Sequence, residues 1–200
     1  MSSIETIRAF PIPILRFKFD QHEEYEFRTV GRKNNIPQGW KMALNSTFPN
    51  IPDNDPIVTP EQRSSLKKDL YTQIRQLFVS DLQITNKFQI GDLWYNIYHQ
   101  GQGQEPHTHL SDCSHPNPFW CGIYYYKGSS PTKFSSPTFA SKIHRWNGVH
   151  ESALRDCFSE YFMPQVSDGD VVLFPPYLEH CVYSDSIKMR MTFAFNLYLI

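Results

Sequence analysis

The clearest pattern in the chain is a strict alternation of side chains from Arg190 to Leu199, which predicts a β-strand. One face of this strand carries Arg190, Thr192, Ala194 and Asn196. The intervening residues are apolar, so the other face should pack into a core. Leu93 to Tyr98 also alternates, but bulky side chains fall on both faces, with Trp94, Asn96 and Tyr98 together on one of them. We expect that strand to be covered on both sides.

Shorter apolar runs bounded by turn residues predict further strands. Trp120–Tyr126 and Val171–Phe174 are strongly apolar, and Pro175-Pro176 ends the second run. Phe158–Val166 is a third candidate. By contrast, residues 20–60 are polar and rich in turn signals, which predicts an irregular region that faces the substrate.

One segment has helical rather than strand periodicity. Thr59, Pro60 and Gln62 form a capping-box start. Apolar residues then recur at helical spacing, namely Leu66, Leu70, Ile74, Leu77 and Phe78. A helix near residues 60–80, ending at Val79 or Asp81, should therefore pack on the outside of a sheet.

Many short strands and one helix predict a mainly β fold, either a β-sandwich or a closed, cupin-like jelly roll. The 200 residues are expected to form a single domain, with residues 1–87 as an N-terminal extension plus helix and residues 88–200 as the jelly-roll core.

Bulk properties exclude several function classes. With a formal net charge of −1, the chain lacks the excess of positive charge that is typical of nucleic-acid-binding proteins. No apolar stretch is long enough to cross a membrane. The polar start of the chain does not read as a signal peptide, and none of the four Cys forms a C-x-x-C pair. We therefore expect a cytoplasmic protein, in the host cytoplasm if viral; the oligomeric state is not predicted.

The candidate chemistry lies in two short segments that carry His107, His109, Asp112 and His180. Residues i and i+2 of a strand share a face, so His107 and His109 can converge on one ion, and a jelly roll can bring His180 to them. Two imidazoles and one carboxylate with open positions suit non-haem Fe(II). Asp112 and His107 compete for the third ligand position.

Arg190 predicts an anion-binding site next to these candidate ligands. An inward-facing Arg is costly in a barrel unless an anion meets it, and its planar fork pairs with a carboxylate. Thr192 lies on the same face of the strand and can reach the same anion.

Several stretches resemble the Fe(II)- and 2-oxoglutarate-dependent oxygenase superfamily, in particular a group of small oxygenases of phage and bacterial genomes. They are Trp94–Tyr98, Pro106–His109, Gly122–Tyr125, Gly169–Pro175, Leu178–His180, Arg190–Thr192 and Asn196. The resemblance implies a double-stranded β-helix and a dioxygenase that uses Fe(II), O₂ and 2-oxoglutarate to hydroxylate a small-molecule or peptide substrate.

The resemblance also implies roles for individual residues. His180 would be the distal iron ligand, Arg190 and Thr192 would bind the far carboxylate of 2-oxoglutarate, and Tyr98 would add a hydrogen bond. The chain departs from the usual H-x-D pattern, because no Asp follows two residues after His107 or His109. Two other interpretations stay open: a cupin-like zinc or nickel protein without 2-oxoglutarate, and a non-catalytic β-sandwich binding module.

Overall fold

The computed structural model describes residues 12–31, 34–110, 116–128, 130–137, 160–183 and 189–200. Within them, one α-helix, one 3₁₀ helix and ten strands form. In chain order they are β1 (Leu15–Lys18), η1 (His22–Glu24), β2 (Asn45–Ser46), α1 (Pro60–Ser80), β3 (Phe88–His99), β4 (Gly103–His107), β5 (Trp120–Lys127), β6 (Lys133–Ser135), β7 (Tyr161–Phe162), β8 (Asp170–Phe174), β9 (His180–Tyr183) and β10 (Met189–Leu199).

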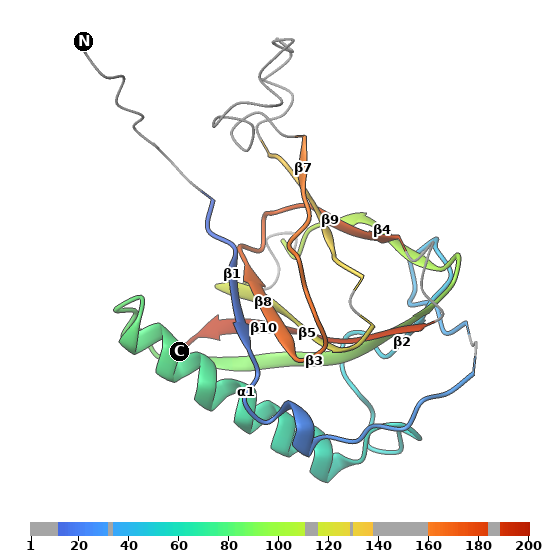
Figure 1. The fold of residues 1–200 in the computed structure, drawn as a ribbon, viewed down its shortest axis with the longest axis horizontal. Helices are drawn as coiled ribbons and strands as arrows, with labels where there is room; N and C mark the ends of the chain where they lie inside the picture. The colour runs from blue at the N-terminus through green and yellow to red at the C-terminus, as the bar shows by residue number, and fades with distance from the viewer. Residues whose placement is uncertain (1–11, 32–33, 111–115, 129, 138–159, 184–188) are drawn as a thin grey trace.

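The strands form two sheets that lie over one another (Figure 1). The major sheet has six strands in the order β1-β8-β5-β10-β3-β2, and the minor sheet has four in the order β4-β9-β6-β7. All of these pairings are antiparallel. Neighbours in these sheets are far apart in sequence, as in β1 with β8, which is typical of a jelly roll rather than of a meander. The predicted mainly β class is confirmed.

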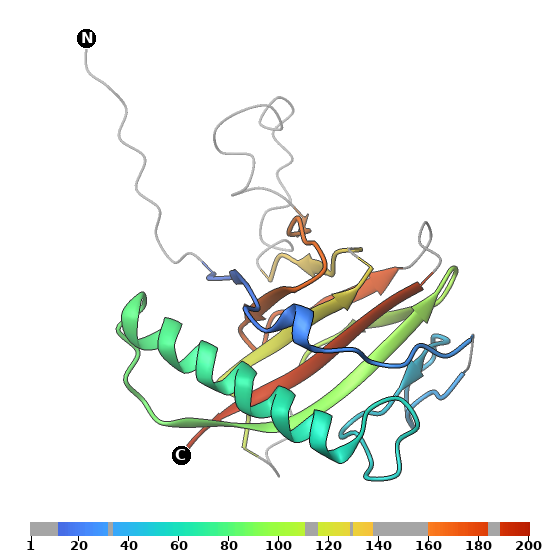
Figure 2. The same ribbon diagram turned by 60° about the horizontal axis from the view of Figure 1, so that its bottom comes forward.

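The predicted helix also forms where its signals place it. Thr59 Oγ1 accepts a hydrogen bond from the Gln62 amide at 3.2 Å, and Gln62 Oε1 accepts one from the Thr59 amide at 3.0 Å. The helix runs across the outer face of the major sheet (Figure 2). Its buried apolar residues Leu66, Leu70, Ile74 and Phe78 join the same core as Tyr95, Ile97, Phe193 and Phe195 of the sheet.

The two long strands β3 and β10 pair antiparallel over most of their length. This register sets Arg190 opposite Tyr98, Thr192 opposite Asn96 and Ala194 opposite Trp94. Directly opposed residues of an antiparallel pair point to the same face. The polar face predicted for β10 and the Trp-Asn-Tyr face predicted for β3 therefore become one continuous surface, turned toward the minor sheet.

The region from residue 20 to residue 60 is better anchored than the sequence indicates. Beyond η1 and β2 it has little regular structure, yet Phe27, Leu44, Ile51 and Val58 are buried. These buried apolar side chains fix the region to the core. Because they do not recur with helical or strand periodicity, the sequence pattern predicts only a loop. Of the predicted 158–166 strand, the two residues of β7 are observed.

Among the residues described, no helix combines the length and the apolar character needed to cross a bilayer.

Replacing Leu70 with Ala should lower the free energy of unfolding by about 3 kcal/mol, because Leu70 is fully buried between α1 and the sheet. The matched control is Lys68→Ala on the exposed side of the same helix, which should change stability by less than about 0.5 kcal/mol. Chemical denaturation measures both. Equal effects would contradict the packing of α1 described above.

Candidate metal and cosubstrate site

Three histidines meet between the two sheets. His107 ends β4 and pairs directly with His180, the first residue of β9, while His109 follows two residues beyond His107. One ligand atom from each ring lies within 4.8 Å of the other two, a spacing that lets all three bind a single ion. His109 lies beyond the end of β4, so a shared strand face does not bring it here. Its backbone amide instead donates to Pro176 O at 2.9 Å.

Hydrogen bonds orient each of the three imidazoles. Nδ1 of His107 donates to Glu105 O at 2.8 Å, and Nδ1 of His180 donates to Leu178 O at 3.0 Å. Nδ1 of His109 donates to Asn196 Oδ1 at 2.7 Å. Since each Nδ1 carries the proton, each Nε2 keeps its lone pair, which is the state that a metal ligand needs.

Burial keeps these imidazoles neutral. It lowers the pKa of His109 to about 4, with a smaller contribution from neighbouring His107. Burial also lowers the pKa of His107 and moves the pKa of His180 well below its usual value. The arrangement is therefore a set of neutral nitrogen donors at neutral pH, suited to a divalent transition metal.

A second layer of contacts supports His109. The Asn196 amide that accepts from His109 also donates to Asp92 Oδ2 at 2.9 Å, and the Tyr198 hydroxyl donates to the same oxygen at 2.7 Å. Sequence analysis placed Asn196 on the correct face of β10 but did not find Asp92. Carboxylate-supported imidazoles of this kind are common at metal sites.

The three histidines line a small inner cavity between the sheets, and Arg190 lines it too. The Arg190 side chain is 1 % exposed. Its Nε donates to Ser130 O at 3.0 Å and one terminal nitrogen donates to Thr132 Oγ1 at 3.1 Å. The other terminal nitrogen, Nη1, is buried and has no partner among the residues described. An unpaired guanidinium N–H facing a cavity is what a carboxylate ligand would satisfy.

Tyr98 and Thr192 also line this cavity. The Arg190 guanidinium carbon lies 4.9 Å from the centre of the Tyr98 ring. The Tyr98 hydroxyl donates to Gln104 Oε1 at 2.9 Å, and burial raises the pKa of Tyr98 to about 12, so it stays a donor. The structure thus brings Arg190, Thr192 and Tyr98 together beside the histidines.

Two polar residues of this cavity were missed by sequence analysis. Gln104 Nε2 lies 3.2 Å from His107 Nε2, and Thr132 Oγ1 accepts a hydrogen bond from the Arg190 guanidinium. The sequence around Gln104 reads as a Gly/Gln-rich turn, although Gln104 lies in β4, and Thr132 falls in a Ser/Pro-rich stretch, so neither carries a local signal. With these side chains in place the cavity measures about 20 Å³, room for one water molecule. Binding of 2-oxoglutarate therefore requires side chains that line this cavity to move.

A wider cleft of about 630 Å³ opens outward from His107 and His109. Trp40, Phe48 and Trp94 wall it, with ring centres 5.4 Å apart for Trp40–Phe48 and 5.2 Å for Phe48–Trp94. Glu105 holds the Trp40 loop in place, because its carboxylate accepts from the Lys41 and Met42 amides.

Asp112, the competing third ligand, lies outside the described residues. The geometry therefore identifies an all-histidine donor set among the part of the chain that the structure describes. This set of neutral nitrogens, with the unpaired Nη1 of Arg190 in the same cavity, fits a divalent metal next to an anion.

Residues 92–196, more than half of the chain, match the family described as "Putative 2OG-Fe(II) oxygenase". The chain belongs to this family. It is a 2-oxoglutarate-dependent dioxygenase, and its cofactors are Fe(II) and 2-oxoglutarate. No curated protein matches the sequence.

Solved structures with similar folds share little sequence with this chain. HygX of Streptomyces hygroscopicus, solved with nickel, 2-oxoglutarate and hygromycin B, has a TM-score of 0.52 at 13 % identity and aligns over 94 % of this chain and 83 % of its own. A 2OG-Fe(II) oxygenase family oxidoreductase from Burkholderia pseudomallei has a TM-score of 0.50 at 10 % identity, over 80 % and 67 %. These likenesses show the fold, and the double-stranded β-helix is confirmed.

A viral collagen prolyl hydroxylase from Paramecium Bursaria Chlorella virus-1 has a TM-score of 0.47 at 14 % identity, over 81 % of each chain. This degree of likeness does not bear on the substrate of the present enzyme.

Replacing His180 with Ala should abolish Fe(II) binding, whereas Asn196→Ala should weaken it about 10- to 100-fold, because Asn196 orients His109 without binding the ion itself. Isothermal titration with Fe(II) under anaerobic conditions separates the two. Asn86→Ala, on an exposed loop, is the control and should leave affinity unchanged. A full-strength site in His180→Ala would refute the histidine cluster as the metal centre.

Proposed function

We propose that this enzyme hydroxylates a C–H bond of a small-molecule or peptide substrate, with His107, His109 and His180 as the Fe(II) ligands. The observation that carries the proposal is the convergence of three oriented, neutral imidazoles beside a buried Arg190 that has an unpaired N–H. Fe(II), when bound, supplies the activation of O₂ that is coupled to oxidation of 2-oxoglutarate to succinate and CO₂.

The protein's own contribution is positioning. Arg190 would bind the far carboxylate of 2-oxoglutarate through Nη1, and Tyr98 and Thr192 would donate hydrogen bonds to the same group. A cosubstrate tethered at that end presents its keto acid to the histidines at a defined distance. The Arg190 side chain cannot drift, because Ser130 and Thr132 hold its other nitrogens.

The aromatic cleft is the proposed place for the substrate. It opens directly on His107 and His109, and the rings of Trp40, Phe48 and Trp94 would exclude water from the reacting carbon. Trp94 lines both the inner cavity and the cleft, so it separates cosubstrate from substrate.

We also propose that residues 1–200 form one domain. Phe19 and Phe27 of the N-terminal part and Phe78 of α1 lie in the same buried cluster as Phe193 of β10, which supports a shared core.

Arg190→Met should raise the KM for 2-oxoglutarate about 30-fold or more, because loss of a buried charge partner costs at least about 2 kcal/mol. The measurement is succinate formed from 2-oxoglutarate with Fe(II) and O₂, including the turnover that occurs without substrate. Arg28→Met, an exposed arginine, should leave the KM unchanged. An unaltered KM in Arg190→Met would rule out Arg190 as the cosubstrate anchor.

The third metal ligand is tested by a set of three variants. If His107 is the third ligand, His107→Asp should keep Fe(II) bound through a carboxylate oxygen, and His107→Ala should lose it. Asp112→Ala should then behave as the wild type. Loss of Fe(II) from Asp112→Ala as complete as from His180→Ala would instead make Asp112 the ligand.

A further inference from the structure

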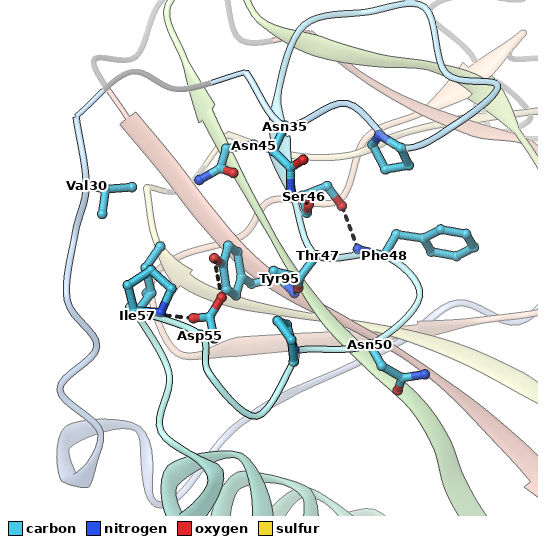
Figure 3. A pocket seen from close by; sticks show the side chains of 13 residues that line it. Val30, Asn35, Asn45, Ser46, Thr47, Phe48, Asn50, Asp55, Ile57 and Tyr95 are labelled. Atoms are coloured by element: carbon cyan, nitrogen blue, oxygen red, sulfur yellow. Dashed lines mark hydrogen bonds between the residues drawn. The ribbon is translucent and has the colours of Figure 1, made fainter.

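A second cavity, of about 420 Å³, lies at the β2–β3 edge of the major sheet (Figure 3). Tyr95 lines it, and Tyr95 alternates along β3 with Trp94 and Asn96, which face the histidines. This cavity is therefore on the opposite face of the strand from the metal site, and it shares no residue with the inner cavity. Its volume lies within the usual range for small-molecule sites.

One end of this cavity holds a fixed carboxylate. Asp55 Oδ1 accepts a hydrogen bond from the Ile57 amide and Oδ2 accepts one from the Tyr95 hydroxyl, each at 2.9 Å (Figure 3). Asp55 Oδ1 also accepts one from the Val58 amide at 2.9 Å. These contacts use three of the roughly four acceptor positions of a carboxylate. The remaining position is available to a ligand donor.

Nothing positive among the described lining residues balances this charge. The lining set contains no Lys, Arg or His, and no ion pair involves Asp55 in the part of the chain that the structure describes. The Asp55 carboxylate itself should attract a cation, here a protonated amine.

A second polar group is left without a partner at the same cavity. The side chain of Asn45 in β2 is only 6 % exposed, lines the cavity, and makes no hydrogen bond with any residue described. Its amide group is therefore open to a molecule in the cavity. The Asn side-chain amide has both a donor and an acceptor, and a hydroxyl group can hydrogen-bond with either of them.

The rest of the lining is mixed, with polar residues such as Asn35 and Thr47 beside apolar ones. Val30, Pro37, Pro52 and Ile57 present aliphatic surface, which suits the C–H faces of a ring or a short alkyl chain. The carboxylate, the unpaired amide and the aliphatic walls together define the ligand. We propose that this cavity is a binding site for a small hydroxylated primary amine, whose ammonium group meets Asp55 and whose hydroxyl meets Asn45.

Three sugars that share one ring and differ in charge test this proposal: glucosamine, glucose and glucuronate. Titration into ¹⁵N-labelled full-length protein, followed by amide chemical shifts, should move the Ile57 and Val58 signals. Glucosamine should bind about fivefold more tightly than glucose, the usual upper limit for one partly exposed ion pair, and glucuronate most weakly.

Two variants assign the effect to residues. Asp55→Asn keeps an oxygen for the loop amides but removes the charge, so it should abolish the preference for glucosamine over glucose. Asn45→Leu should weaken binding of both sugars. Asp53→Asn is the matched control, because Asp53 is an exposed carboxylate two residues away that pairs with Arg63, and the preference should survive.

Thermal unfolding of each variant verifies that it folds. Equal affinity for glucuronate and glucosamine, shifts confined to the Trp94 cleft, absence of binding, or a preference that survives in Asp55→Asn would each overturn the proposal. Because no metal or 2-oxoglutarate is needed for the titration, its failure leaves the proposed hydroxylase reaction unaffected, and the converse also holds.

Discussion

The antiparallel pairing of β3 with β10 is the constraint on which the candidate site depends. It sets Arg190 beside Tyr98 and Thr192 beside Asn96, and it carries Asn196 to the point where it supports His109. Side chains alternate with a period of two, so a slip of one residue would turn Arg190 into the apolar core and Met191 into the cavity. The wholly apolar face of β10 prevents this slip, because Phe193 and Phe195 are buried against α1 and its neighbours.

The same pairing explains how the fold tolerates a buried cation. Arg190 is almost fully buried, and an unpaired charge there would cost several kcal/mol. Part of this cost is offset by the two hydrogen bonds that the guanidinium donates. The rings of Tyr98 and Tyr125, whose centres lie 4.9 and 5.2 Å from the guanidinium carbon, offset a further part. The unpaired Nη1 is the part that stays uncompensated. Stability is thus given up at the position where an anionic cosubstrate would restore it.

The sequence predicts those parts of the site that belong to regular elements. Arg190, Thr192 and Tyr98 could be placed because strand periodicity determines the face of each side chain. Gln104, Thr132 and Asp92 could not, because each acts through a partner that only long-range strand pairing brings near. The helix was found for the opposite reason, since its capping box and apolar stripe are both local. His107 and His109 fall between these cases: they are visible as a pair, but it is the Pro176 contact, not a strand, that positions the second.

The all-histidine donor set that we propose would have an electrostatic consequence for this cavity. Neutral imidazoles leave the charge of a divalent ion undiminished, whereas a carboxylate ligand would remove one unit of it. No Asp or Glu lines the inner cavity among the described residues, and Asp92 is linked to His109 through Asn196. Arg190 adds a further positive charge to the same space. A site held by three histidines alone would attract a dianion such as 2-oxoglutarate more strongly than the usual H-x-D arrangement does.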